Sequence, residues 1–99
     1  MKKYSSNEII EMLKGHRALL KKYSVVRIGL FGSFARNEST ATSDIDLLVD
    51  FEDKSFDNFM NLADELENLF GRKVDLLTQK GMSPYIFPLV KNEILWYEA

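Results

Sequence analysis

Two aspartates separated by one residue, Asp44 and Asp46, begin an apolar run that ends at Phe51. Alternate side chains of a β-strand point to one face, so these carboxylates share a face with Cβ atoms roughly 6–7 Å apart. Like charges this close destabilise a fold unless a cation or hydrogen bonds neutralise them. Mg²⁺ suits such a pair because it prefers oxygen ligands and accepts substrate phosphates, although Mn²⁺ accepts the same ligands. We therefore expect a site for two Mg²⁺ ions, which lie ~3.5–4 Å apart in phosphoryl-transfer enzymes.

A third aspartate, Asp75, interrupts the short apolar run 74–77. An aspartate in such a strand is disfavoured unless it is functional or lies at an exposed edge. If this strand pairs beside the strand of Asp44 and Asp46, Asp75 completes a cluster of three carboxylates. Its expected role is to bind the catalytic metal and to help deprotonate an attacking hydroxyl. Asp50 has the same strand parity but lies by the far turn, so we interpret it as a solvated strand end.

A glycine–serine pair, Gly32 and Ser33, follows another apolar run, 25–31. Glycine permits backbone geometry that a Cβ forbids, and the free N–H groups of a helix that begins at Ser33 suit a phosphate. The Ser33 hydroxyl can also donate to a phosphate oxygen. Arg36 stands about one turn further on and either reaches a triphosphate or pairs with a nearby acid. The sequence leaves both roles of Arg36 open, and we expect Gly32, Ser33 and Arg36 to form a nucleotide site.

Helices and strands alternate along the chain in the pattern of apolar residues. A capping box formed by Ser5 and Glu8 begins a helix that we expect to run to about Tyr23. A later amphipathic helix ends at Gly71, which suits the C′ position. The expected elements are helix 6–23, strand 25–31, a short helix at 34–36, strand 44–51, helix 56–70 and strand 74–77. This order predicts an α/β (α+β) fold in which helices pack on a small mixed β-sheet.

The C-terminal part of the chain is less regular. Pro84 and Pro88 predict a broken or late-starting helix, and the run 94–97 fits either a helix end or a short edge strand. The apolar and aromatic residues of 85–87 and 96–97 fit either a partner interface or the core, and we interpret most of them as core.

Composition sets the class of protein. With 99 residues, 45% of them hydrophobic, we expect a single domain over residues 1–99. The 13 basic and 15 acidic residues leave a net charge of −2, which argues against a general nucleic-acid binder. The absence of cysteine excludes disulfides and thiolate metal sites. No apolar run approaches the length of a membrane span, so we expect a soluble cytoplasmic protein without a membrane partner.

The segments Gly-Ser-Phe-Ala-Arg (32–36) and Ser-Asp-Ile-Asp-Leu-Leu-Val (43–49) together resemble the signature of the DNA polymerase beta-type nucleotidyltransferase superfamily. The short length resembles its minimal nucleotidyltransferase (MNT) branch, and the resemblance extends from about residue 25 to residue 97. It implies that the glycine–serine pair contacts the triphosphate and that Asp44, Asp46 and Asp75 bind metal. Asn37 departs from the glycine of many relatives, but asparagine tolerates a left-handed backbone.

The resemblance implies transfer of a nucleoside monophosphate from a triphosphate to a hydroxyl, with release of pyrophosphate. MNT proteins are often paired, as antitoxins, with a small helical HEPN toxin, and they silence its RNase activity by attaching AMP to a tyrosine. Our leading hypothesis is this activity, with ATP as donor and a HEPN-type partner. Two alternatives stay open: a small-molecule nucleotidyltransferase that forms its acceptor pocket as a homodimer, and an antitoxin that blocks its partner sterically without catalysis.

Overall fold

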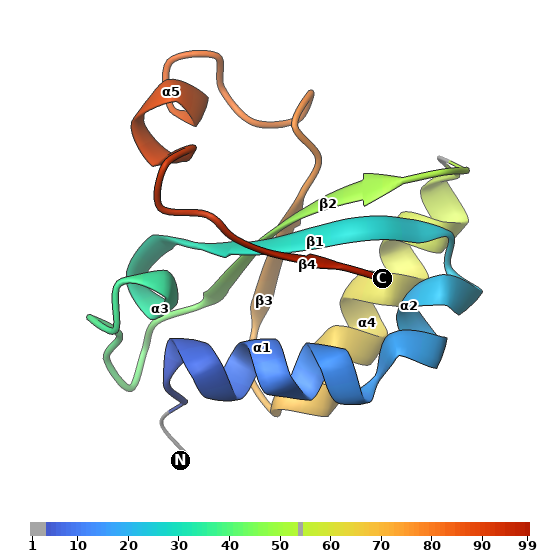
Figure 1. The fold of residues 1–99 in the computed structure, drawn as a ribbon, viewed down its shortest axis with the longest axis horizontal. Helices are drawn as coiled ribbons and strands as arrows, with labels where there is room; N and C mark the ends of the chain where they lie inside the picture. The colour runs from blue at the N-terminus through green and yellow to red at the C-terminus, as the bar shows by residue number, and fades with distance from the viewer. Residues whose placement is uncertain (1–3, 54) are drawn as a thin grey trace.

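The computed structural model describes residues 4–53 and 55–99. Its helices are α1 (Ser6–Gly15), α2 (Arg17–Lys22), α3 (Gly32–Ala35), α4 (Phe56–Phe70) and α5 (Phe87–Val90). Its strands are β1 (Val25–Phe31), β2 (Ile45–Phe51), β3 (Val74–Leu77) and β4 (Leu95–Glu98). Figure 1 shows the sheet across the middle of the molecule, with α1, α2 and α4 on one side and α5 on the other. The predicted fold class is confirmed.

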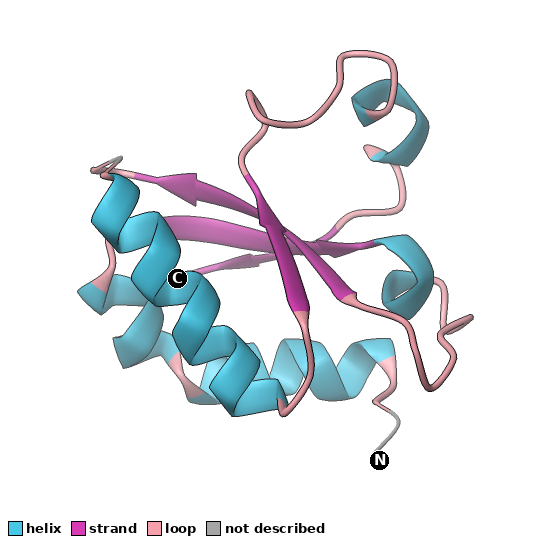
Figure 2. Cartoon of the chain, turned by 180° about the vertical axis from the view of Figure 1, so that it is seen from behind, coloured by secondary structure: helices cyan, strands magenta, loops and turns pink. Residues whose placement is uncertain are grey.

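The four strands are ordered β3-β2-β1-β4. β1 pairs antiparallel with both β2 and β4, whereas β2 and β3 are parallel. A parallel pair needs a crossover connection. The helix α4 lies between β2 and β3 in the sequence, and it supplies this connection by packing on the sheet. The crossing strands and the covering helices are seen from behind in Figure 2. The sheet is therefore mixed, as its element order predicted.

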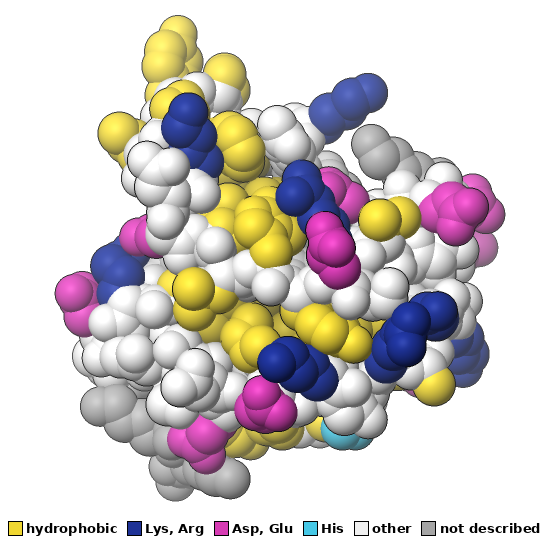
Figure 3. All heavy atoms as spheres, in the orientation of Figure 1, with side chains coloured by type: hydrophobic (Ala, Val, Ile, Leu, Met, Phe, Trp, Pro, Cys, Tyr) yellow, Lys and Arg dark blue, Asp and Glu magenta, His cyan; other side chains and the backbone are white. Residues whose placement is uncertain are grey.

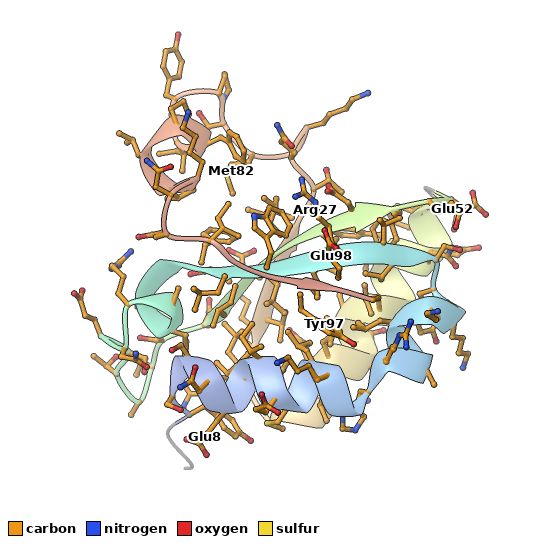
Figure 4. All side chains as sticks on the ribbon, in the orientation of Figure 1. Glu8, Arg27, Glu52, Met82, Tyr97 and Glu98 are labelled. Atoms are coloured by element: carbon orange, nitrogen blue, oxygen red, sulfur yellow. The ribbon has the colours of Figure 1, made fainter. Side chains whose placement is uncertain are left out.

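Two apolar clusters lie on opposite faces of the sheet. The main core fills the space under α1, α2 and α4 and includes the completely buried Ile9, Leu13, Leu20, Ile28, Leu30, Ile45, Leu47, Leu62 and Leu66. The smaller cluster lies on the other face and consists of Phe31, Leu48, Met82 and Ile94, with Phe87 and Trp96 packed against it. It holds the segment that contains α5 against the sheet. Figure 4 shows Tyr97 on the side of α1, and Met82 beyond the opposite face.

The first predicted helix is divided in two. The Ser5 hydroxyl accepts from Glu8 N at 3.1 Å and the Glu8 carboxylate accepts from Ser5 N at 3.0 Å, so the predicted capping box is confirmed. The helix ends at Gly15 because His16 leaves the helical region, with φ −120° and ψ 34°. The Nδ1 atom of the exposed His16 ring lies 2.8 Å from the carbonyl oxygen of Met12. Glycine is a weak helix former, which favours the interruption here.

The later boundaries follow the sequence more closely. The Ser55 hydroxyl caps α4 by accepting from Asn58 N at 3.0 Å, and Gly71 ends the helix at φ +63°. The segment 94–97 contributes an edge strand, which was one of its two predicted forms. Within the described residues, none of the helices is long and apolar enough to cross a membrane.

The core interpretation of the C-terminal aromatic segment is wrong at its tip. Tyr85 is 84% exposed and Ile86 is 46% exposed. Both residues lie in the turn before α5, and neither is among the residues that pack against the smaller cluster. Phe87 and Trp96 do pack against the smaller cluster. Figure 3 shows the resulting group of hydrophobic side chains over α5 at the top of the molecule.

Candidate active site

Asp46 and Asp75 are direct neighbours in the parallel pair β2–β3. The flanking pair Ile45 and Val74 is buried in the main core, so the two aspartates emerge on the opposite face. Asp44 lies just before β2, which begins one residue later than predicted. The condition on which the role of Asp75 depended, pairing of its strand beside that of Asp46, is thus met. Neighbouring strands lie ~4.8 Å apart, so the two carboxylates share one small region of the sheet.

The charged form of the Asp46 carboxylate is destabilised by burial and by the neighbouring carboxylates. Burial, and then the charges of Asp75 and Asp44, raise the pKa of the Asp46 carboxyl from 3.8 to about 6, although Arg36 acts in the opposite direction. Across residues 4–53 and 55–99, the side chains of Asp46 and Asp75 accept no hydrogen bond and form no ion pair. Among the described residues, the cation that pairs with Asp44 is Lys73, whose Nζ lies 3.9 Å from Asp44 Oδ2. The negative charge of the cluster is therefore poorly compensated.

The donor set fits a hard divalent cation. All three side chains offer carboxylate oxygens, which Mg²⁺ prefers, and a cation would relieve the repulsion that raises the pKa of Asp46. In the part of the chain that the structure describes, however, no three acidic, histidine or cysteine side chains already converge as a metal site. The side chains of Asp44 and the exposed Asp75 therefore have to turn toward Asp46 if an ion is to be held by all three.

The glycine turn packs directly against this cluster. Phe31 is the cross-strand partner of Asp46, so the turn that follows β1 begins beside the carboxylate. Gly32 has φ +77°, and a Cβ at this position would collide with Asp46 Oδ2. Only glycine combines this backbone conformation with the close approach. Ser33 follows in α3 and is half-buried. The structure thus brings the predicted Gly32 and Ser33 to the predicted carboxylates.

Arg36 pairs with acids in this structure, which is one of its two predicted roles. Its Nη1 donates to both carboxylate oxygens of Glu93, each at 3.1 Å, and its Nε donates to Glu38 at 3.3 Å. These hydrogen bonds, first to Glu93 and then to Glu38, raise the pKa of the Arg36 guanidinium above its usual value. The same Glu93 carboxylate accepts from Gly32 N at 3.2 Å.

Glu93 was not among the site residues predicted from the sequence. The register of β1 and β4 pairs Leu30 with Leu95 in antiparallel fashion, so the residues beyond each strand end also approach one another. Glu93 comes two residues before Leu95, and Gly32 comes two residues after Leu30. If residues 95–98 had been assigned to an edge strand paired with β1, the contact between Glu93 and Gly32 could have been predicted.

Two further polar residues hold the segments around the cluster. Asn37 has φ +56°, and its side chain accepts from Ser6 N at 2.8 Å and donates to Ser6 Oγ at 3.2 Å. The left-handed backbone expected for this asparagine is confirmed. Its side-chain hydrogen bonds to Ser6 connect the end of α3 to α1. Arg72 Nη1 donates to Ser43 O at 2.7 Å, and its guanidinium lies 5.1 Å from the centre of the Phe34 ring. It therefore positions the loop that leads to the carboxylates.

Asp50 is not part of this cluster, but it is not freely solvated either. It forms an ion pair with its cross-strand partner Arg27. The Arg27 guanidinium also stacks on Trp96, 3.9 Å from the ring centroid. These contacts correct the interpretation of Asp50 as a solvated strand end. Because β4 places Trp96 against the Arg27 guanidinium, Arg27 is positioned to pair with the Asp50 carboxylate. Arg27 is labelled in Figure 4, on the same side of the sheet as Met82.

Comparison with known proteins agrees with this geometry. The family model described as polymerase beta, nucleotidyltransferase, matches residues 7–98. The chain is 41% identical over 95 residues to the protein named putative protein adenylyltransferase MJ1379 of Methanocaldococcus jannaschii, covering 91% of this chain and 95% of that one. It is 37% identical over 91 residues to protein adenylyltransferase MntA of Thermococcus cleftensis, covering 90% and 92%. The chain belongs to the polymerase beta nucleotidyltransferase family.

Solved structures place it more narrowly within that family. A structure described as a putative minimal nucleotidyltransferase matches with a TM-score of 0.79 and 29% identity, over 96% of this chain and 98% of that one. A toxin–antitoxin structure with AMP-PNP matches with a TM-score of 0.60 and 26% identity, over 74% of this chain and 61% of that one. The fold and the nearly complete coverage are those of a minimal nucleotidyltransferase.

Proposed function

We propose that this enzyme is a metal-dependent protein adenylyltransferase that transfers AMP from ATP to a partner protein and so acts as an antitoxin. The observation that carries the proposal is the adjacency of Asp46 and Asp75 beside the glycine turn at Gly32. Acidic oxygens and a phosphate-binding turn in one place are what phosphoryl transfer requires. The names of the relatives support a protein acceptor, and the AMP-PNP of the toxin–antitoxin structure supports ATP as the donor.

Each residue has a defined part in this reaction. The N–H of Gly32, the hydroxyl of Ser33 and the guanidinium of Arg36 bind the triphosphate. Asp44, Asp46 and Asp75 would hold Mg²⁺, which stabilises the charge that develops on the transferred phosphate. The acceptor oxygen forms a bond to the α-phosphorus while the α–β bridging P–O bond breaks and pyrophosphate leaves. The hydroxyl proton passes to the carboxylate of Asp75.

The position of Asp75 favours an acceptor that arrives on another protein. Asp75 is exposed and lies on β3, which is an edge strand of the sheet. A hydroxyl carried on the surface of a partner can therefore approach the proton acceptor without entering an enclosed pocket. We propose a tyrosine of a HEPN-type toxin as this acceptor, as the resemblance of the sequence to MNT antitoxins implies.

The test is a transfer assay with the protein encoded beside this chain in its genome. The two purified proteins are incubated with ATP and Mg²⁺, and the intact mass of each is measured. We expect the partner to gain one or more AMP groups, and Asp46→Asn or Asp75→Asn to abolish the gain. Asp53→Asn is the matched control, because Asp53 is an exposed aspartate in the turn after β2 and should leave transfer unchanged.

The other outcomes separate the alternatives. A stable complex without any mass gain, formed equally by the wild type and by Asp46→Asn, would indicate a steric antitoxin and contradict the proposal. Pyrophosphate release only with small hydroxyl compounds, together with a homodimer in solution, would indicate a small-molecule nucleotidyltransferase instead.

A further inference from the structure

The carboxylate of Glu93 is bound by the donors that we assign to the triphosphate. One of its oxygens accepts from Gly32 N at 3.2 Å, and both accept from Arg36 Nη1 at 3.1 Å. A backbone N–H and a guanidinium are the kind of donor set that binds a phosphate group. The Glu93 side chain is 24% exposed, so it fills this position rather than extending into solvent.

We propose that Glu93 occupies a phosphate position in the nucleotide-free enzyme, and that ATP has to displace it in order to bind. This inference rests on the proposed function, since it concerns the same Gly32 and Arg36. A backbone amide has one hydrogen, so the N–H of Gly32 cannot serve Glu93 and a phosphate oxygen with full strength at once. A triphosphate beside the glutamate would also meet a like charge. Glu93 therefore competes with the nucleotide.

The local fold allows the carboxylate to leave. Glu93 lies in the short turn between α5 and β4, and its N–H donates to Val90 O at 2.9 Å. The strand pairing with β1 begins only at Leu95, and the buried Ile94 anchors the chain in the smaller cluster. Rotation of the Glu93 side chain therefore leaves the backbone of β4 in place. Glu93 sets the affinity for the phosphate groups without being needed for the fold of the sheet.

Arg36 offers a control for this interpretation. It is held on two edges, by Glu93 through Nη1 and by Glu38 through Nε at 3.3 Å. Glu38 makes no contact with the N–H of Gly32, which donates to Glu93. Neutralising Glu38 removes a more exposed ion pair of the same arginine but leaves the phosphate position filled. The two glutamates thus separate competition for the site from a simple change of charge near Arg36.

The experiment measures the dissociation constants of AMP-PNP, inorganic tripolyphosphate and adenosine for the wild type, Glu93→Gln and Glu38→Gln. We expect Glu93→Gln to bind AMP-PNP and tripolyphosphate about fivefold more tightly, the change that corresponds to loss of one partly exposed ion pair. Adenosine should bind all three proteins alike, and Glu38→Gln should resemble the wild type. Thermal unfolding of each variant shows that it is folded.

The outcomes distinguish this inference from the proposed function. If the wild type binds AMP-PNP but Glu93→Gln binds it equally or more weakly, Glu93 positions Arg36 for the nucleotide and the inference is overturned. If Glu38→Gln gains as much affinity as Glu93→Gln, general charge explains the effect and competition is again rejected. If no form of the protein binds AMP-PNP or tripolyphosphate, the proposed function fails as well. A second readout is the amide signal of Gly32 in nuclear magnetic resonance spectra, which Glu93→Gln and tripolyphosphate should each shift.

Discussion

Gly32 and Asp46 meet at the end of the β1–β2 pair, where the carboxylate fills the space that a Cβ on residue 32 would need. The turn and the charged cluster are thus one packed unit. A side chain at position 32 either displaces the carboxylate or changes the turn, and it also has to adopt a positive φ. Substitution at this glycine tests whether the unit matters for the reaction.

We expect Gly32→Ala to reduce AMP transfer by about 100-fold or more, because a displacement of the order of 1 Å in a phosphoryl-transfer site is that costly. It should also destabilise the fold by about 1–2 kcal/mol through the left-handed backbone. Gly15→Ala is the matched control, since a Cβ on Gly15 meets nothing within 4 Å. Transfer assays and urea unfolding of both variants provide the measurement. Wild-type activity in Gly32→Ala would show that the contact is dispensable.

The raised pKa of Asp46 predicts how the stability of the metal-free protein depends on pH. Its value of about 6 in the folded protein lies above the ordinary 3.8, so between these values the folded state holds the proton more firmly than the unfolded chain. The free energy of unfolding should therefore decrease as the pH rises from about 4 to about 6. Asp46→Asn should flatten this decrease and stabilise the metal-free protein at pH 7 by roughly 1 kcal/mol, a discounted value because the carboxylate is partly solvated.

Urea unfolding in the presence of a chelator, at several pH values between 4 and 8, measures this effect. Addition of Mg²⁺ at pH 7.5 should raise the stability of the wild type more than that of Asp46→Asn, because the ion binds only the folded site. Asp53→Asn serves again as the control. A pH profile shared by the wild type and Asp46→Asn would contradict the assigned electrostatics.

Asp75 and Asp46 should be separable by their effects on binding and on transfer. Asp75 is exposed, and the proposed function makes it the proton acceptor, so its loss should affect proton removal more than nucleotide affinity. We expect Asp75→Asn to lower the rate of AMP transfer by about 10²–10⁴-fold, with AMP-PNP affinity changed only a few-fold. Single-turnover rates and equilibrium binding of AMP-PNP distinguish the two quantities. An equal loss in both would mean that Asp75 acts mainly in binding.

Asn37 combines a left-handed backbone with two side-chain hydrogen bonds to Ser6. Asn37→Gly keeps the backbone geometry but loses the hydrogen bonds, at a cost of about 1 kcal/mol. Asn37→Ala loses both, so we expect about 2 kcal/mol. Chemical unfolding of the two variants measures the order. Equal stability of the glycine and alanine variants would show that the backbone conformation contributes little.

The sequence predicted those features that depend on neighbours along the chain. The limits of β1, α4 and β3 were predicted from the pattern of apolar residues and, for α4, from the stop at Gly71, both of which act locally. The adjacency of Asp46 and Asp75 could be stated only as a condition, since strand pairing joins distant segments. Glu93 was missed for the same reason: its contacts with Gly32 and Arg36 depend on how β4 pairs with β1.

Other deviations reflect competition between local preference and packing. His16 interrupts an apolar pattern that continues through Leu20, because the chain must change direction to bring both helices onto the sheet. Tyr85 looks like a core residue by type, but it lies in the turn before the short α5, outside both apolar clusters, and remains in solvent. Residue type alone does not decide burial where the supporting helix is only one turn long.

Because β2 and β3 pair in parallel, we expect the site to assemble late in folding. Asp46 and Asp75 belong to strands that can pair side by side only after the whole of α4 has crossed over the sheet. Until that helix docks, the two carboxylates lie on segments far apart along the chain, and parallel pairing between such segments is slow compared with the formation of contacts between near neighbours in sequence. A nascent or partly unfolded chain therefore lacks the assembled centre, and catalytic activity reports that folding is complete.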